Sequence, residues 1–175
     1  MWIAQLRDLL AAHEPVRLPR ENRVPSAVAV PLSVRDGHLS ATFIQRSGEV
    51  NHPNQISFPG GQIEAEDADL YATALREMEE EIGVPGRLVL RIGELSDQIT
   101  PTGFWIHPFV TAIPQASVFS TRDAHEVVDI FSAPILNLEI VQGKWGPEFH
   151  HGKRVIWGVT ARILGELLEV MGQAL

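Results

Sequence analysis

The sequence predicts an α/β fold in which a mixed β-sheet is flanked by helices. Two strand-like segments, 27–34 and 39–45, surround an Asp36-Gly37 pair that is typical of a hairpin turn. The pattern becomes helical over 67–82, with Asp67 or Asp69 as the expected N-cap and Gly83 as the expected end, and again near the carboxyl end, with further strand candidates between. Because strands and helices are interspersed without strict alternation, we expect a mixed sheet rather than a purely parallel one.

The amino-terminal 25 residues predict a short amphipathic helix over 2–13 and a proline-containing loop over 14–25. Pro31 predicts an edge position or a bulge for the first strand, because proline has no N–H for a central ladder. The chain is expected to form one domain over residues 1–175. The remaining expected elements are strands over 88–95, 105–113 and 127–131, a hairpin over 149–157 and a final helix over 161–171.

Composition narrows the class of protein. Hydrophobic residues make up 45% of the 175 positions and charged residues 21%, which is typical of a globular domain. The absence of cysteine excludes disulfides, thiolate metal sites and a cysteine nucleophile. A net charge of −8 argues against broad binding to nucleic acid. The sequence has neither a secretory leader nor an apolar run of about 20 residues, so we expect a soluble, cytoplasmic protein with no membrane partner.

One predicted helix carries an acidic face. At about 100° per residue, Glu77, Glu80 and Glu81 fall within an arc of roughly 100°, while Glu79 points to the far side. Like charges at this spacing repel, and a hard divalent cation with a preference for oxygen ligands resolves the repulsion. Arg76 can hold one of these carboxylates through a bidentate pair. The competing interpretation is a solvated acidic surface, which is the usual role of such a run.

Residues 76–84 read Arg-Glu-Met-Glu-Glu-Glu-Ile-Gly-Val, which matches the Nudix signature R-E-U-x-E-E-x-G-U, where U is a bulky aliphatic residue. Gly61 matches the glycine that opens the Nudix box, here 61–84, and Asp67 stands for the usual glutamate after a loop one residue longer. The sequence therefore resembles the Nudix hydrolases, which implies an α/β/α sandwich. It also implies water attack on a phosphorus of a nucleoside diphosphate derivative. The residues implied for Mg²⁺ or Mn²⁺ binding and catalysis are Gly61 through its carbonyl, Glu77, Glu80 and Glu81, with Arg76 as an electrostatic anchor.

The resemblance extends beyond the box to the coenzyme A pyrophosphatase branch. It implies a small-molecule nucleotide substrate, coenzyme A or an acyl derivative, cut to 3′,5′-ADP and 4′-phosphopantetheine. The segments that carry it are 55–61, 100–104, 107–108, 126–129 with Pro134, and 156–164. The substrate-binding residues that it implies are Arg46, Ser47, His52, Gln55, Phe58, Gly60, Thr102 and Phe104.

The arginine motif of that branch is incomplete here, because Val50 or Asn51 stands where a second arginine is usual. This departure motivates an alternative substrate: ADP-ribose, a dinucleotide or a nucleoside triphosphate. A Nudix-fold module that binds a nucleotide without hydrolysis is a further alternative, which the intact glutamate set disfavours. The residue that serves as general base, the preferred metal and the oligomeric state (monomer or homodimer) stay open.

Several other residues have two interpretations. Arg46 either contacts substrate phosphate or caps a strand in solvent. Glu126 is either an additional acid/base or metal ligand, or a surface carboxylate, and the surface role is slightly favoured. Trp157 is expected in the core rather than as a base-stacking residue. His150 and His151 lack partner ligands at diagnostic spacing, so no second metal site is expected.

Overall fold

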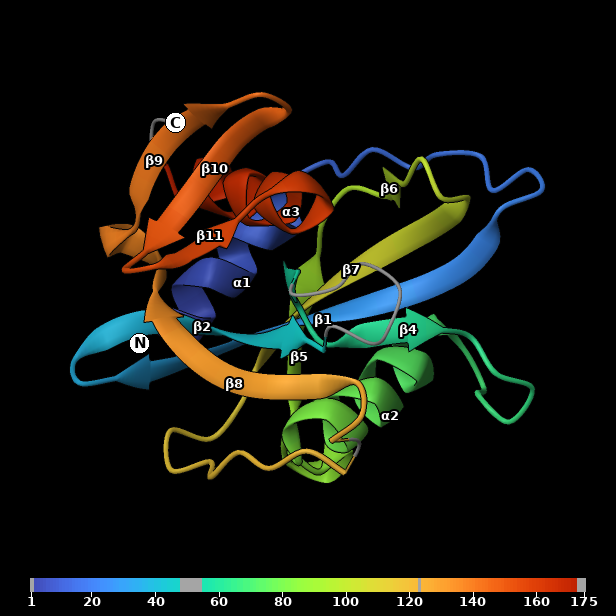
Figure 1. Ribbon diagram of the computed structural model, residues 1–175, viewed down its shortest axis with the longest axis horizontal. Coiled ribbons are helices and arrows are strands. Elements are labelled where there is room, and N and C mark those ends of the chain that lie inside the picture. Colours follow the sequence, from blue (N-terminus) through green and yellow to red (C-terminus); the bar gives the residue numbers. More distant parts are fainter. Residues whose placement is uncertain (1, 48–54, 123, 173–175) are drawn as a thin grey trace.

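The computed structural model describes residues 2–47, 55–122 and 124–172 and contains two sheets and three α-helices over this range (Figure 1). The helices are α1 (Trp2–Ala12), α2 (Leu70–Ile82) and α3 (Gly158–Val170). The larger sheet contains β1 (Val24–Arg35), β2 (His38–Arg46), β3 (Ile56–Ser57), β4 (Gly60–Gln62), β5 (Leu90–Glu94), β6 (Gln98–Ile99), β7 (Phe104–Ala112) and β8 (Val127–Pro134). The smaller sheet contains β9 (Glu139–Gly143), β10 (Gly146–His151) and β11 (Arg154–Ile156). Two short 3₁₀ turns are η1 (Gly86–Leu88) and η2 (Ile135–Asn137).

The larger sheet is mixed, as the sequence predicts. Its strands run in the order β3-β2-β1-β7-β5, with β4 paired to β1, β6 to β7 and β8 to β2. The central pair β1 and β7 is parallel, and the other pairs are antiparallel. Asp36 and Gly37 both have positive φ between β1 and β2, which confirms the predicted hairpin turn. Among the described residues, no helix is both long and apolar enough to cross a membrane.

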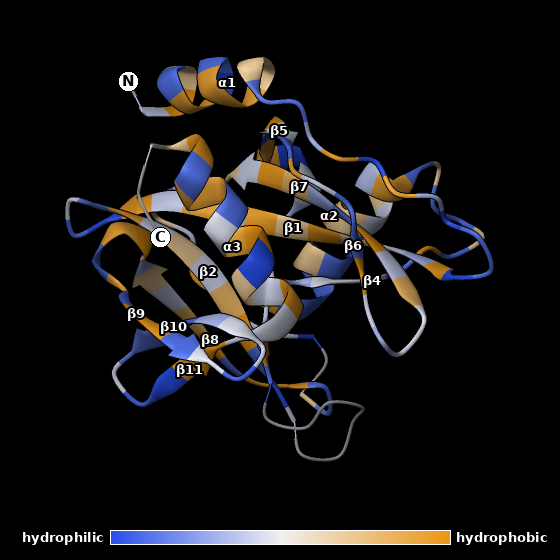
Figure 2. Ribbon diagram, turned by 90° about the horizontal axis from the view of Figure 1, so that it is seen from above, coloured by the Kyte–Doolittle hydropathy of each residue, from blue (hydrophilic) through white to orange (hydrophobic). Residues whose placement is uncertain are grey.

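Helices cover both faces of the larger sheet, so the sandwich architecture is confirmed (Figures 1 and 2). Along β1, Val28, Val30 and Leu32 face the core shared with α1 and α3. Ala27 and Ala29 face the opposite core, which α2 closes. Side chains alternate across a strand, and the small alanines let α2 lie close to the sheet.

Pro31 does not mark an edge strand, so that expectation is wrong. β1 is central, with β7 along one side and β2 and β4 sharing the other. The β4 pairing ends at Val28, Ala29 N–H donates to the Pro59 carbonyl, and the β2 pairing begins at Leu32. Pro31 falls where one partner strand gives way to the next, so its missing N–H leaves no ladder bond unmade.

The helix α2 begins at Leu70, after the expected position 67, and the structure has the second of the two expected N-cap residues. Asp69 is the N-cap, and its side chain accepts a hydrogen bond from Ala72 N–H. Gly83 ends the helix at φ 73°, as the sequence predicts. Other boundaries also shift: a 3₁₀ turn occupies 86–88, so β5 begins at Leu90, and α3 begins at Gly158 rather than at 161.

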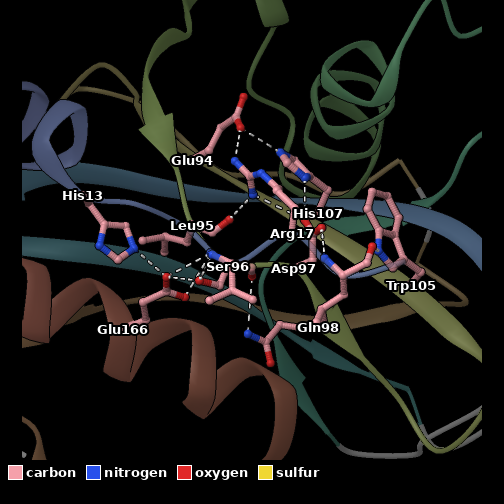
Figure 3. A network of polar contacts seen from close by, with 12 residues as sticks. His13, Arg17, Glu94, Leu95, Ser96, Asp97, Gln98, Trp105, His107 and Glu166 are labelled. Carbon is pink, nitrogen blue, oxygen red and sulfur yellow. Dashed lines mark hydrogen bonds and ion pairs between the residues drawn. The ribbon is translucent and has the colours of Figure 1, made fainter. Parts of the chain in front are cut away.

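A network of polar side chains fastens the segment after α1 to the sheet and to α3 (Figure 3). Asp97 is only 1% exposed, and its carboxylate accepts from Leu18 N–H at 2.9 Å and lies 2.8 Å from His107 Nδ1. Glu166 of α3 accepts from Ser96 N–H and the Ser96 hydroxyl. We call the set the amino-terminal polar network; its members are His13, Arg17, Glu94, Ser96, Asp97, His107 and Glu166.

Candidate active site

Two glycines of β4 bring the sheet against α2. Val28 pairs with Gly60 and Ala27 pairs with Gly61 in the antiparallel β1–β4 ladder. A Cβ added to Gly60 would lie 2.3 Å from the Ala27 carbonyl oxygen, and one added to Gly61 would lie 2.2 Å from Glu77 Oε1. Glycine at 60 therefore allows β4 to lie this close to the β1 backbone, whereas a side chain at 61 would have to displace the Glu77 carboxylate.

Glu81 is the most deeply buried carboxylate of α2, at 3% exposed. Its Oε2 accepts a hydrogen bond of 2.8 Å from Gly60 N–H, and its Oε1 lies 3.8 Å from Arg46 Nη1. Burial raises the pKa of Glu81 to about 8, because the surroundings disfavour the charged form more than these two partners favour it. Glu81 is thus a buried acid whose negative charge is only partly compensated.

Glu77 and Glu80 share one partner on the same helix. Nη1 of Arg76 donates to Glu77 Oε1 at 2.9 Å and to Glu80 Oε2 at 3.2 Å. Burial raises the pKa of Glu77 despite the opposing effect of Arg76, whereas Glu80 is 45% exposed. In the following, Glu77, Glu80 and Glu81 are called the acidic cluster.

Arg76 makes its bidentate pair with Asp67, not with a member of the acidic cluster. Its Nε and Nη2 donate to the two carboxylate oxygens of Asp67 at 3.1 and 3.0 Å. Asp67 also accepts from Glu64 N–H and from the Thr73 hydroxyl. The hydrogen bonds from Arg76 are the main cause that lowers the pKa of Asp67 to about 2. Asp67 therefore fixes Arg76 from the loop side, and Arg76 in turn fixes Glu77.

Arg46 and Glu126 face the acidic cluster from the end of β2 and from the residue before β8. Arg46 Nη2 lies 3.4 Å from Glu126 Oε2, and Ser47 N–H donates to the Glu126 carbonyl at 2.7 Å. The charge of Glu126 contributes to the raised pKa of both Glu77 and Glu81. Glu126 thus lies near the cluster with a side chain that is 45% exposed, and its role as an additional acid/base or metal ligand stays a prediction.

Two predicted site residues lie close to this group, and one does not contact it. The Gly60 N–H contacts Glu81 directly, and the Gln55 carbonyl accepts from Arg46 N–H. Phe58 instead stacks on Phe43, with ring centroids 4.8 Å apart, and is buried in the core beneath α1 and α3. The expectation of substrate contact through the Phe58 side chain is corrected, because this ring is buried against other apolar side chains.

Thr102 lies in the turn that precedes β7, and Phe104 is the first residue of that strand. The Thr102 hydroxyl lies 3.0 Å from the Thr100 hydroxyl, and Phe104 N–H donates to the same Thr100 oxygen. Among the described residues, no hydrogen bond or ion pair joins this turn to the acidic cluster. The expected residue His52 lies outside the described residues, as do positions 50 and 51 of the incomplete arginine motif.

The donors around the acidic cluster fit a hard divalent cation. They are the carboxylate oxygens of Glu77, Glu80 and Glu81, which Mg²⁺ and Mn²⁺ prefer as ligands, and a cation would relieve the charge buried at Glu81. Within residues 2–47, 55–122 and 124–172, no three acidic or histidine side chains converge tightly enough to hold a metal ion as they stand. Arg76 and the Gly60 N–H contact oxygens of Glu77, Glu80 and Glu81.

Trp157 is the residue whose role the sequence analysis missed most clearly. It was expected in the core, yet it is 42% exposed, forms the N-cap of α3 and lines a cavity beside β2 and β11. Lys153 and Arg154 line the same cavity. The one available signal was local: a His-Gly-Lys-Arg run, 151–154, in a chain of net charge −8.

Comparisons with known proteins identify the family. The NUDIX domain model matches residues 23–150. The chain is 33% identical over 165 residues to the uncharacterized Nudix hydrolase NudL of Enterobacter sp. (strain 638), covering 86% of this chain and 84% of that protein.

Solved structures share the fold at low sequence identity. The Nudix hydrolase RenU of M. smegmatis superposes with a TM-score of 0.58 at 13% identity, covering 87% of this chain and 89% of that one. The NUDIX domain of Shewanella oneidensis NrtR, solved with ADP ribose, gives 0.53 at 19% identity, covering 74% and 83%. From the family model, the NudL relative and the shared fold, we conclude that the chain belongs to the Nudix hydrolase family and is an enzyme of that family.

Proposed function

We propose that this Nudix hydrolase cuts the diphosphate of coenzyme A or an acyl-coenzyme A with Mg²⁺ or Mn²⁺. A water oxygen bonds to one phosphorus and the bridging P–O bond breaks. The two phosphates of the diphosphate leave as monoesters, one in 3′,5′-ADP and one in 4′-phosphopantetheine. The cysteine-free sequence is compatible with the reducing cytoplasm, which is the location the proposal assumes.

The observation that carries the hydrolase site is the buried Glu81 carboxylate on the Gly60 N–H, next to Glu77 at Gly61. A fold gains nothing from burying partly compensated carboxylates side by side, since desolvation disfavours each charge. Nudix hydrolases generally use divalent metal ions, and such an ion would compensate the negative charge of these carboxylates.

In this proposal the acidic cluster and the Gly61 carbonyl hold the cation, which when bound polarises the phosphate oxygens and acidifies the attacking water. One carboxylate of the cluster takes the proton from that water. Arg76, fixed by Asp67, keeps Glu77 and Glu80 in place. Arg46 lies within 3.8 Å of Glu81 and pairs with a substrate phosphate, with Ser47 and Gln55 beside it. Glu126 is a proposed additional acid/base.

The coenzyme A assignment rests on the segments outside the box that resemble the coenzyme A pyrophosphatases. A second candidate, ADP-ribose or another nucleoside diphosphate derivative, is favoured by the absence of the second arginine at 50 or 51. The structural neighbour NrtR was solved with ADP ribose, which supports the same candidate.

A substrate panel tests the proposal. The purified chain is incubated with coenzyme A, ADP-ribose and NADH, each with Mg²⁺, with Mn²⁺ or with chelator, and the products are separated by chromatography. We expect 3′,5′-ADP and 4′-phosphopantetheine from coenzyme A with metal and none with chelator. Faster turnover of ADP-ribose or NADH would overturn the coenzyme A assignment and keep the hydrolase. Nucleotide binding without any metal-stimulated turnover would overturn the catalytic site.

A further inference from the structure

A cavity of about 770 Å³ lies between the end of β2, β3 and the β10–β11 hairpin. Its volume is within the range of roughly 300–1,000 Å³ that small-molecule sites occupy. The side chains used in the argument below are those of Gln45, Ile56, His151, Lys153, Arg154 and Trp157. None of the predicted catalytic residues lines it.

The charge of the cavity is opposite to that of the chain. Its charged lining residues are Lys153 and Arg154, whereas the whole chain has a net charge of −8. Arg154 donates to Asp129 at 2.6 Å and lies over the Phe131 ring. Within the part of the chain that the structure describes, the Lys153 ammonium has no ion-pair or hydrogen-bond partner. An unpaired cation at a cavity wall attracts an anionic group.

The cavity also offers an aromatic surface and a polar edge. Trp157 lines it and remains 42% exposed, although burial would be favourable for so large an apolar side chain. The Gln45 side-chain amide has no hydrogen-bond partner among the described residues, so its donors and acceptor are available. An exposed indole beside an amide and a cation matches a nucleobase with a nearby phosphate.

The cavity adjoins the acidic cluster along two segments of the chain. Gln45 lines the cavity, and the next residue, Arg46, lies 3.8 Å from Glu81. Ile56 lines the cavity, and Gly60, four residues later, donates to Glu81. At roughly 3.3 Å per residue, four residues span at most about 13 Å, so one extended ligand can reach both places.

We infer that this cavity is the subsite for the nucleoside half of the substrate: Trp157 stacks on the base and Lys153 pairs with a phosphate monoester on the ribose. The inference rests on the proposed function and refines it, because it names which end of the substrate lies at the β10–β11 hairpin. Gln45 supplies hydrogen bonds to the base edge, and the scissile diphosphate lies toward Arg46.

The chain offers a matched control for both residues. Lys144 and Trp145 are adjacent in the β9–β10 turn, away from the cavity, and Trp145 is exposed. Affinity is measured by calorimetry on the full chain in chelator, so that turnover is not required. The probes are adenosine 3′,5′-bisphosphate and adenosine 5′-monophosphate, and thermal unfolding checks that each variant folds.

We expect Trp157→Ala to weaken both probes about tenfold, because stacking is lost for either nucleotide. Lys153→Ala weakens only the 3′,5′-bisphosphate, also about tenfold, and Lys153→Glu weakens it more. Lys144→Ala and Trp145→Ala leave both affinities unchanged. Equal affinities in all variants, or no binding by the wild type, would overturn the inference. An equal loss for both probes in Lys153→Ala would overturn the ribose-phosphate assignment.

Failure of the proposed function is distinguishable from failure of this inference. Turnover of coenzyme A with unchanged nucleotide affinities in the Trp157 and Lys153 variants would keep the function and reject the subsite. Selective loss of binding without turnover of any panel substrate would keep the subsite and reject the function.

Discussion

The amino-terminal polar network and the acidic cluster bury carboxylates in opposite ways. In the network, Asp97 has Arg17, His107 and Leu18 N–H around it, and Glu166 has Ser96 and His13. In the cluster, three glutamates share Arg76, Arg46 and one N–H, and Arg76 is already bound to Asp67. The carboxylates of the network are paired within the protein and need no ligand, whereas the carboxylates of the cluster have an excess of negative charge that attracts a cation. Polar groups that stabilise the fold are fully paired, and those proposed for catalysis are not.

The largest expected effect is on turnover. Glu81→Gln keeps an oxygen for the Gly60 N–H but removes the charge, so we expect turnover to fall roughly a thousandfold, in line with the loss of a catalytic carboxylate. Glu79→Gln is the control on the same helix, because Glu79 pairs with Arg122 on the far side, and its turnover should stay near wild type. Turnover retained in both Glu80→Gln and Glu81→Gln would remove the cluster from catalysis.

The same Glu81→Gln variant should not lose stability. The folded-state pKa of Glu81 is raised from 4.5 to about 8, so the wild type loses stability as pH rises through that interval in metal-free buffer. The glutamine variant lacks this loss. Denaturant unfolding at pH 5 and pH 8 with chelator measures the difference, and a variant less stable than the wild type at pH 8 would contradict the comparison.

The network should respond in the opposite sense. Asp97→Ala leaves His107, Arg17 and a backbone N–H without their buried partner, so the free energy of unfolding should fall by about 3 kcal/mol. Folded Asp97→Ala should retain turnover near the wild-type value. Asp8→Ala, at an exposed position of α1, is the control, and its free energy of unfolding should change by less than about 0.5 kcal/mol. Strong loss of turnover in the folded variant would show that the network is more than structural.

A smaller effect is expected from the glycine that borders the cluster. The Cβ of Gly61→Ala would displace the Glu77 carboxylate, so turnover should fall about tenfold and more metal should be needed for half-maximal rate. Gly86→Ala adds a Cβ at an ordinary 3.4 Å from Leu75 and should leave the rate unchanged. If Gly61→Ala and the wild type need the same metal concentration for half-maximal rate, Gly61 has no part in metal binding.

The smallest effect concerns Asp67, whose two carboxylate oxygens both accept hydrogen bonds from Arg76. The pKa of Asp67 is lowered from 3.8 to about 2, so its stabilisation is present above pH 4 and is lost as pH falls toward 2. Asp67→Asn should lower the free energy of unfolding at pH 7 by about 1 kcal/mol, after allowance for solvent screening. The gap between variant and wild type should close by pH 2. A gap independent of pH would assign the loss to packing instead.

The sequence predicts best what local chemistry determines. The Asp36-Gly37 turn, the Gly83 cap and the acidic face of α2 follow from turn geometry and helical period, and the structure has all three. The resemblance implied a shared site for Gly61 and the glutamates, but the hydrogen bond from Gly60 N–H to Glu81 was not predicted, since no local pattern links residues 21 positions apart.

Long-range packing accounts for the failures. Pro31 was assigned to an edge because the exchange of partners along β1 is a tertiary property. Phe58, named as a substrate-binding residue, is buried in the core, and Trp157, expected in the core, lines a cavity, because aromatic residues suit either environment and tertiary packing decides. The polar network joins residues 13, 97, 107 and 166, a constellation that no local pattern encodes.

The parallel pairing of β1 with β7 has a consequence for biosynthesis. Val24 pairs with Phe104, 80 residues later, and both β4 and α2 lie in the intervening chain. Closing so long a loop lowers the chain entropy before the β1–β7 contacts stabilise it, and proteins with such topologies fold slowly. During synthesis on the ribosome, β1 cannot pair with β7 until residues 104–112 have emerged. Until then, the β1 edge that pairs with β7 is open to other chains. The glutamates of α2 are already synthesised at that stage, but the central β1–β7 pair of the sheet that orders them forms only when β7 arrives.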